Sequence, residues 1–300
     1  MLSRMLSNIL LNSGIGSGIL KKAHAGRFIL SIYFHDPSRK EFEGCVGWLK
    51  AHGFHFLTLS ELLSIHKNEQ PFPAGAVVLT VDDGWKSNQA NIVQVAEKLK
   101  VPVAIFISTE PVEKGWYWWS YIEQAVKTNL TSISVAQLKK VPNENRLRVI
   151  GDLKERISLS RNALTVQQIQ EIAKSPHITM GSHTHTHPIL TNCSVHQVCA
   201  EVEISKEKIE SWTGKEVSTF AYPNGSYSAR ERDILEAHKF QLAFTTQAQY
   251  LTREALDHPL DLPRFEVRSN VPFEENICRM LGIWEILFQR LKRNFSFARV

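Results

Sequence analysis

Paired cysteines are absent from this sequence. The 300 residues include only four scattered cysteines, with no CxxC pair among them: Cys45, Cys193, Cys199 and Cys278. Because cysteine pairs at metal-ligand spacing are missing, a structural zinc knuckle is disfavoured. We therefore expect four reduced cysteines with a packing role, as in a reducing compartment.

Long apolar runs are also missing. No stretch of roughly 18 or more apolar residues occurs, so no membrane-spanning helix is predicted. Residues 1–25 faintly resemble a signal peptide, with an apolar stretch at 9–11 and small residues at 23–25. However, Lys21 and Lys22 stand where the apolar stretch should continue. We expect a cytoplasmic protein, and secretion is the less favoured alternative.

Acidic residues are absent at both ends of the chain. None precedes Arg27 and none follows Glu285, so the modest net charge of +5 is concentrated at the termini. A nucleic-acid-binding protein would carry a more extended basic surface, and no nucleic-acid partner is predicted. The composition, 43% hydrophobic and 22% charged, argues against global disorder and suits one large globular domain.

Between the two ends, buried-type strands alternate with amphipathic helices. Helical spacing is present at residues 42–52, 89–99, 195–212 and 229–238. The alternation predicts an α/β fold with a parallel sheet or barrel, in which functional sites form at the carboxyl ends of the strands. The predicted strands are residues 27–35, 54–58, 76–81, 101–107, 178–182, 219–222, 242–246 and 262–267.

Residues 115–175 interrupt this alternation. They begin with the aromatic cluster Gly-Trp-Tyr-Trp-Trp at 115–119 and continue as polar helical segments. We interpret them as a helical insertion into the main domain. Two interpretations of the aromatic cluster stay open: the rings pack the base of the insertion, or some of them stack on sugar faces beside the site.

The segment 273–300 has the pattern of a basic amphipathic helix. Apolar residues recur with i, i+3, i+4 spacing between Ile277 and Phe295, while the other face is basic. This helix either packs on the main domain or lies on an anionic membrane surface. We therefore divide the chain into a basic and apolar segment at 1–26, a main domain at 27–272 and this helix.

Two short segments carry candidate chemistry. Residues 80–84 read Thr-Val-Asp-Asp-Gly, and residues 183–188 read His-Thr-His-Thr-His-Pro. Adjacent aspartates at a strand end point in different directions, so one can bind a cation while the other acts as a base. Together the segments supply the groups that hold one divalent metal ion and activate a water molecule. An ordinary Asp-Asp-Gly turn and a solvated polar loop are the alternatives.

These segments resemble the motifs of a known family. Residues 80–84 are similar to the T-F-D-D-G motif of the polysaccharide deacetylases, the NodB-homology group of carbohydrate esterase family 4. Residues 183–188 resemble its H-[ST]-x-x-H motif, and residues 220–225, Phe-Ala-Tyr-Pro-Asn-Gly, resemble a third motif. The resemblance covers roughly residues 27–270. It implies a distorted (β/α)7-type barrel, with the helical insertion as an addition.

The resemblance also implies roles for individual residues. Asp82 would be the catalytic base, and Asp83, His183 and His187 would hold one divalent ion. Zinc is expected, and cobalt, nickel and manganese also suit two imidazoles and a carboxylate. His185, at a variable position of the second motif, is expected to support the metal ligands or contact substrate rather than bind the ion. The residues expected to bind substrate or the oxyanion in the third motif are Tyr222, Pro223 and Asn224.

Two departures from the family pattern concern the remaining catalytic groups. The family's last strand, L-x-I-x-L-H, carries the general acid, and nothing similar follows Arg264. Residues 30–35 fit L-x-I-x-x-H instead, as in circularly permuted members, so His35 is predicted to be the acid. A partly buried structural histidine is the alternative. The family's third-motif arginine is also missing, and Arg264 is predicted to reach Asp82 in its place.

The predicted function is metal-dependent removal of acetyl groups from an N-acetylated sugar of a polysaccharide or lipid-linked glycan. The basic ends and the missing signal peptide suggest cell-envelope biosynthesis at the inner membrane face. One alternative keeps the fold but changes the substrate to a small cyclic amide. Another is a catalytically inactive carbohydrate-binding or membrane-scaffold module.

Overall fold

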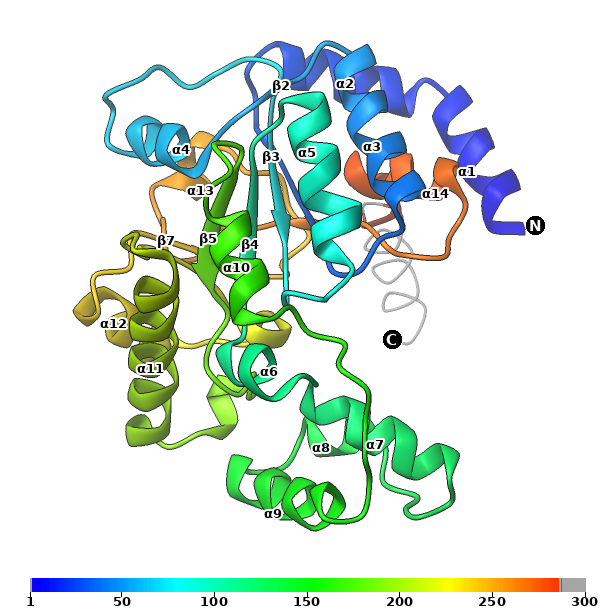
Figure 1. Cartoon of the computed structure of the whole chain (residues 1–300). Helices are drawn as coiled ribbons and strands as arrows, with labels where there is room; N and C mark the ends of the chain where they lie inside the picture. Colours follow the sequence, from blue (N-terminus) through cyan, green and yellow to red (C-terminus); the bar gives the residue numbers. More distant parts are fainter. Residues whose placement is uncertain (1, 286, 288–300) are drawn as a thin grey trace, which may run out of the picture.

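A parallel sheet organises the chain (Figure 1). The computed structural model describes residues 2–285 and 287. The strands follow the order β7-β6-β5-β4-β3-β1-β8, and β2 (His55–Phe56) pairs with β3 outside this path. The strands on the path are β1 (Leu30–Phe34), β3 (Ala76–Val81), β4 (Val103–Ile107), β5 (Ile178–Ser182), β6 (Thr219–Ala221), β7 (Leu242–Phe244) and β8 (Phe265–Glu266).

The sheet curls until its two edges meet. The Leu262 N–H donates to the Ala243 carbonyl oxygen, and the Thr245 N–H donates to the Leu262 carbonyl oxygen, each at 2.8 Å. The segment that leads into β8 therefore bonds to β7, while β8 itself pairs with β1. These bonds link β7 to β1 through an irregular junction, and the predicted distorted α/β barrel is confirmed.

Apolar side chains explain why the strands form where they do. Strands β1, β3 and β4 are buried along their full length, as expected for a parallel sheet covered on both faces. Successive side chains alternate between the faces, so Val77 and Val81 join the core beneath the helices while Val78 packs in a second core with Phe106 and Phe244. Both β3 and β5 have the bounds predicted from the sequence.

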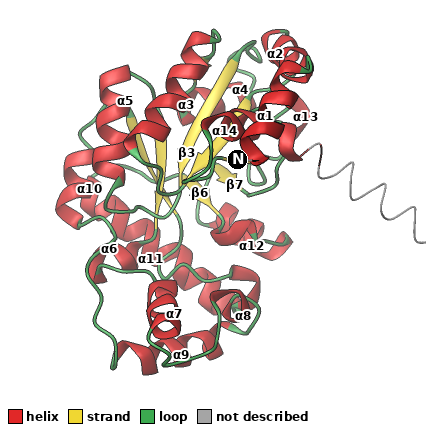
Figure 2. Cartoon of the chain, turned by 90° about the vertical axis from the view of Figure 1, so that its right-hand side faces the viewer, coloured by secondary structure: helices red, strands yellow, loops and turns green. Residues whose placement is uncertain are grey.

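Helices surround the strands (Figure 2). Several begin at capping boxes, as Ser38 and Glu41 do for α3, which fixes their first turns. These outer elements are α3 (Arg39–Ala51), α4 (Leu59–His66), the π-helical turn η1 (Gln89–Val93), α5 (Gln94–Leu99), α10 (Val166–Ile172), η2 (Leu190–Asn192), α11 (Val195–Thr213), η3 (Pro223–Gly225), α12 (Ala229–Ala237), α13 (Arg253–Leu256) and α14 (Phe273–Met280).

The helical insertion is narrower than the sequence predicts. Short α6 (Thr109–Lys114) leads into α7 (Trp118–Lys127), α8 (Val135–Leu138) and α9 (Asn143–Lys154), which group at one end of the barrel (Figure 1). These three helices share a small core of their own. In contrast, α10 packs against α11 and η1 and so belongs to the barrel. The insertion therefore ends before α10 rather than at residue 175.

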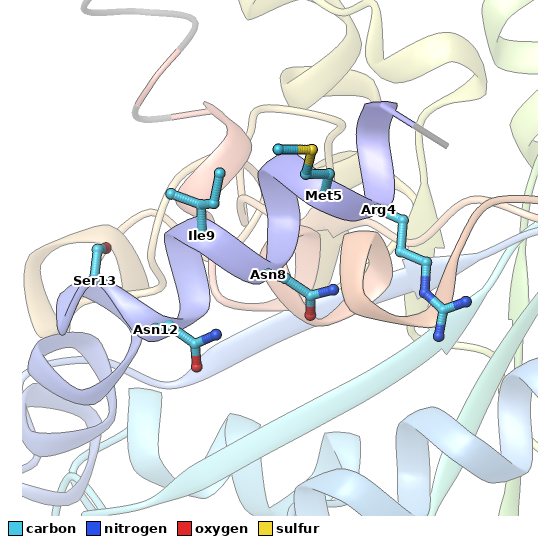
Figure 3. A pocket seen from close by; sticks show the side chains of 6 residues that line it. All are labelled: Arg4, Met5, Asn8, Ile9, Asn12 and Ser13. Atoms are coloured by element: carbon cyan, nitrogen blue, oxygen red, sulfur yellow. The ribbon is translucent and has the colours of Figure 1, made fainter.

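Both ends of the described chain pack together. The N-terminal segment forms α1 (Leu2–Asn12) and α2 (Ile15–His24), and α1 lies against α14. The outer face of α1 keeps Met5 and Ile9 exposed around a shallow pocket (Figure 3). No helix in the described part of the chain is long and apolar enough to cross a membrane.

In the described part of the C-terminal segment, the helix is shorter than the sequence predicts. Helix α14 ends at Met280, and Gly282 follows with a left-handed φ of 67°, so the predicted helix is interrupted at this glycine. Ile277 and Met280 are buried in the main core, which is the packing that the amphipathic pattern allowed. Residues 286 and 288–300 lie outside the described part. All four cysteines are free thiols.

Candidate active site

Asp82 continues an inward-facing row of side chains on β3. Because side chains alternate along a strand, Val78, Thr80 and Asp82 share one face, and Asp82 lies just past the strand's carboxyl end. Its carboxylate is 2% exposed and accepts two hydrogen bonds from the Arg264 guanidinium, both at 2.8 Å. The structure thus places Arg264 against Asp82, where the sequence predicted it.

Arg264 is fully buried beneath this carboxylate. Its remaining N–H groups donate to Thr80 Oγ1 at 2.8 Å and to the Thr245 carbonyl oxygen at 3.0 Å. The guanidinium also lies 4.4 Å from the centre of the Tyr33 ring. Burial by itself would raise the pKa of Asp82, but Arg264 outweighs it and holds that pKa below its usual value. Asp82 is therefore ionised at neutral pH.

Asp83 points away from Asp82 because the backbone changes direction between them. Asp83 has a left-handed φ of 74°, and Gly84 follows with a φ of 87°. A side chain at Gly84 would also place its Cβ 2.7 Å from Ile107 Cγ2, so only glycine fits there. Trp85 Nε1 donates to Asp83 Oδ2 at 2.9 Å, which leaves Oδ1 facing the histidine segment.

The second motif brings two imidazoles to Asp83. The Asp83 Oδ1 atom lies 3.6 Å from His183 Nε2 and 3.3 Å from His187 Nε2. His183 donates through Nδ1 to the Ala221 carbonyl oxygen at 2.7 Å, which leaves its Nε2 with a lone pair. Burial lowers the pKa of His183 to about 4, so the ring is neutral at pH 7.

This arrangement fits a divalent cation. The three ligand atoms lie within 4.8 Å of one another, and all three residues are buried. Without a cation, a carboxylate oxygen would face the lone pair of a neutral imidazole in a buried site, which is unfavourable. Two ligands about 2 Å from a tetrahedral ion stand about 3.3 Å apart, close to the separations from Asp83 to the two imidazoles. The residues present therefore suit a two-histidine, one-aspartate metal site.

His35 belongs to the same cavity. It follows β1, the strand beside β3, and lines a cavity of about 450 Å³ together with Asp82, Asp83, His183 and His187. Its backbone carbonyl accepts a hydrogen bond from Asn88 Nδ2 at 3.0 Å. The structure thus brings together His35 and the groups predicted for metal binding and base catalysis, although residues 35 and 183 are far apart in the sequence.

Of the four residues predicted to bind substrate or the oxyanion, only Asn224 is among those that line this cavity; His185, Tyr222 and Pro223 are not. The His185 ring turns toward α6, where Nδ1 is 2.7 Å from Thr109 Oγ1. Tyr222 is fully buried. Its hydroxyl donates to the Leu260 carbonyl oxygen, and its backbone N–H donates to the Phe244 carbonyl oxygen. These two side chains thus lie away from the cavity wall, and of the two roles expected for His185, support of the ligands or substrate contact, its position fits the first. Their side chains hold the surrounding loops because neighbouring elements offer them hydrogen-bond partners.

The third motif still reaches the site through Asn224. This residue lines the cavity with a left-handed φ of 57°, directly after buried Pro223. Gly225 continues the turn, and a Cβ there would stand 2.0 Å from Thr246 Oγ1. The glycine therefore allows the turn to pack against the segment after β7. Asn224 Oδ1 also accepts a hydrogen bond from Lys139 Nζ of the insertion at 3.0 Å.

The sequence did not reveal several residues that build the site. Trp85 orients Asp83, and a tryptophan directly after a Thr-Val-Asp-Asp-Gly segment was a signal available in the sequence. Further additions come from the insertion, whose Trp119, Glu123 and Lys139 form a wall of the cavity. The aromatic cluster at 115–119 was a signal for Trp119, but the helical spacing of Glu123 and Lys139 gave no sign of this position, because only the packing of the insertion on the barrel creates the wall.

The family model described as polysaccharide deacetylase matches residues 69–243, which include all three motifs. The chain belongs to the polysaccharide deacetylase family. This polysaccharide deacetylase is accordingly an enzyme. Its fold places the Asp82–Arg264 pair beside Asp83, His183 and His187, the three residues that could hold a metal ion.

Among curated proteins, relatives of this polysaccharide deacetylase share a name. A poly-β-1,6-N-acetyl-D-glucosamine N-deacetylase of Staphylococcus aureus is 23% identical over 252 residues, covering 84% of this chain and 74% of the relative. The protein of the same name from Escherichia coli is 20% identical over 271 residues. That match covers 81% of this chain but 35% of the relative.

Solved structures show the same fold. The Streptococcus pyogenes deacetylase PplD in complex with acetate has a TM-score of 0.61 at 20% identity, covering 84% of this chain and 96% of PplD. IcaB from Ammonifex degensii has a TM-score of 0.63 at 18% identity, covering 85% of this chain and 97% of IcaB. The polysaccharide deacetylase described here therefore shares the barrel of these proteins.

Proposed function

We propose that this enzyme uses one divalent metal ion to remove acetyl groups from a glycan of β-1,6-linked N-acetylglucosamine. The observation that carries the proposal is the ionised Asp82, held by Arg264, at the same cavity as Asp83, His183 and His187. The linkage and the sugar come from the names of the relatives in Staphylococcus aureus and Escherichia coli.

The two aspartates have different roles in this proposal, Asp83 in metal binding and Asp82 in base catalysis. Asp83 Oδ1, His183 Nε2 and His187 Nε2 would hold the ion, zinc being favoured over cobalt, nickel or manganese. When bound, such an ion supplies Lewis acidity that polarises the amide carbonyl and makes a water more acidic. Asp82 removes a proton from the attacking water. The backbone N–H of Asn224, at the cavity wall, is our candidate for stabilising the developing oxyanion.

His35 completes the mechanism as the general acid that protonates the leaving amine. Its position after β1 places it at the cavity with both aspartates. We expect His35→Gln to lower kcat by about 10²–10⁴-fold, the usual contribution of a positioned acid. Metal content, measured by atomic absorption, serves as the control and should stay unchanged. Full activity in His35→Gln would mean that His35 is a structural histidine.

The insertion provides a surface for the sugar. Of the aromatic cluster, Tyr117 and Trp118 are buried, while Trp119 is partly exposed and lines the cavity. Both interpretations of the cluster therefore apply to different rings: two pack within the protein, and we propose that Trp119 stacks on a pyranose face. A flat aromatic ring at the cavity wall favours a sugar over a small cyclic amide.

Acetate release tests the function directly. We expect acetate from β-1,6-linked N-acetylglucosamine oligomers when zinc or cobalt is present, and none after chelation until metal is restored. Chitin oligomers, which carry the same acetamide in β-1,4 linkage, are the matched control for linkage and should react more slowly. Release from chitin oligomers alone would overturn the proposed linkage. Metal binding without acetate release from any glycan would favour a binding module, and hydrolysis of a cyclic amide alone would favour the other enzymatic alternative.

A further inference from the structure

The backbone around the second motif is held in an unfavourable conformation. Thr184 and His187 have left-handed φ angles of 69° and 54°, which residues with a Cβ rarely adopt. A loop with two such residues keeps its shape only when surrounding groups hold it. Two local hydrogen bonds restrain it: the His187 N–H donates to Thr184 Oγ1 at 3.1 Å, and the Thr184 N–H donates to Ser182 Oγ at 3.3 Å.

The insertion supplies further restraints at His187. Its carbonyl oxygen accepts a hydrogen bond from Trp118 Nε1 at 3.0 Å and a longer one from Arg146 Nη1 at 3.4 Å. The Trp119 ring meets the His187 ring edge-on, with centroids 4.7 Å apart. His187 is therefore contacted through both its backbone and its ring by residues of the insertion.

Arg146 links these contacts to the opposite side of the loop. Arg146 Nη2 donates to Thr186 Oγ1 at 3.4 Å, and the same hydroxyl donates to Glu201 of α11 at 2.6 Å. The Glu201 carboxylate also accepts from the Thr186 N–H at 2.7 Å. A cation on α9 and an anion on α11 thus hold Thr186 from two sides. The next residue along the chain is His187.

Arg146 is a buried cation whose charge packing alone does not explain. Its side chain lies on α9 and over the Trp118 ring, and the residue is 2% exposed. Among residues 2–285, no carboxylate forms a salt bridge with it, and its hydrogen bonds go to neutral oxygens. Burying a cation without a paired anion is costly. A side chain that served only to pack α9 would not need that charge.

We propose that Arg146 and Trp118 are positioning residues for the metal ligand His187, so that metal binding and folding of the insertion are coupled. The inference rests on the proposed role of His187 as a metal ligand. Trp118 belongs to the core of the insertion together with Tyr121, Ile122 and Ile150. The donor that holds the His187 carbonyl is therefore in place only when the insertion is folded. By linkage, an ion bound to His187 stabilises the insertion in return.

The test measures metal affinity rather than activity. We compare wild type, Arg146→Met, Trp118→Phe and Arg148→Met as metal-free proteins titrated with zinc against a chromophoric chelator. Arg146→Met and Trp118→Phe should bind zinc about 10–100-fold more weakly, as is usual when a group that orients a ligand is lost. Arg148 is the matched control, because it is exposed on the same helix and its guanidinium donates a hydrogen bond to Asn145 rather than to the histidine loop. Arg148→Met should bind zinc as wild type does.

Hydrogen exchange provides a second readout. Zinc should slow amide exchange in residues 116–159 of wild type and Arg148→Met, and should do so much less in Arg146→Met. Unchanged zinc affinity in both Arg146→Met and Trp118→Phe would overturn the coupling, even if both variants melt at lower temperature. If Arg146→Met fails to fold, Trp118→Phe, which keeps an aromatic ring in the core, decides the question alone. Failure of wild type to bind zinc would overturn the ligand assignment and the coupling with it.

Discussion

Replacing Asp82 by asparagine should lower kcat/KM for acetate release by about 10²–10⁴-fold, the range expected when a positioned general base is lost. Asparagine has nearly the shape of aspartate and can still accept one hydrogen bond from Arg264. It cannot accept a proton from the attacking water. The loss should therefore fall on kcat, because Asp82 is only 2% exposed and its oxygens are occupied by Arg264 rather than available for holding the sugar.

Asp83→Asn provides the contrast for this experiment. Both substitutions remove one negative charge from adjacent residues, but Asp83 faces the two imidazoles and Asp82 faces Arg264. We expect Asp82→Asn to retain one bound metal ion with little activity, and Asp83→Asn to lose both metal affinity and activity. The measurement is initial rate together with metal content of the purified protein. Wild-type rates in Asp82→Asn would place the base elsewhere.

Removing Arg264 should have the largest effect on stability. Arg264→Met should lower the free energy of unfolding by about 3–5 kcal/mol, because it leaves the Asp82 carboxylate buried and unpaired. The guanidinium also satisfies Thr80 Oγ1 and the Thr245 carbonyl oxygen, both of which lie in the barrel interior. Urea unfolding at pH 7 measures the difference. Arg268→Met is the control, since Arg268 is exposed and its pair with Glu266 should contribute no more than about 1 kcal/mol.

The same pair makes stability depend on pH in a defined direction. Arg264 holds the pKa of Asp82 below its usual value, so the folded state binds that proton less readily than the unfolded state. The contribution is therefore fully present above the unfolded pKa, about 3.9, and is lost as pH falls through the folded pKa. In Arg264→Met, the largest influence that opposes burial is removed, so the pKa of Asp82 should rise and the acidic limb of the kcat/KM profile should move to higher pH.

Arg264→Lys separates charge from geometry. Lysine keeps the positive charge but cannot donate to both carboxylate oxygens in a planar fork. We expect the free energy of unfolding of Arg264→Lys to lie between the values for wild type and Arg264→Met. Its activity should be reduced, because the Asp82 carboxylate is less firmly oriented. Full activity in Arg264→Lys would show that the bidentate contact is unimportant for catalysis.

The sequence by itself determined the barrel strands and the set of groups for one metal site. Strands β3 and β5 have their predicted bounds. For β3 the reason is local, because a strand buried on both faces is a nearly continuous apolar run. Asp82, Asp83, His183 and His187 could be placed at strand ends for the same reason. In parallel α/β folds those ends meet at one edge, so residues about a hundred positions apart were expected at one site.

Only the tertiary structure decided which way individual side chains turn and what holds them. His185 and His187 are two residues apart, yet the left-handed backbone at His187 directs only the latter to Asp83. Tyr222 turns to Leu260, and the insertion supplies Arg146 and Trp118 beneath the histidine loop. These outcomes depend on contacts between segments distant in the chain, so no local pattern specifies them. Sequence periodicity indicates which residues are buried, whereas packing determines which atoms they meet.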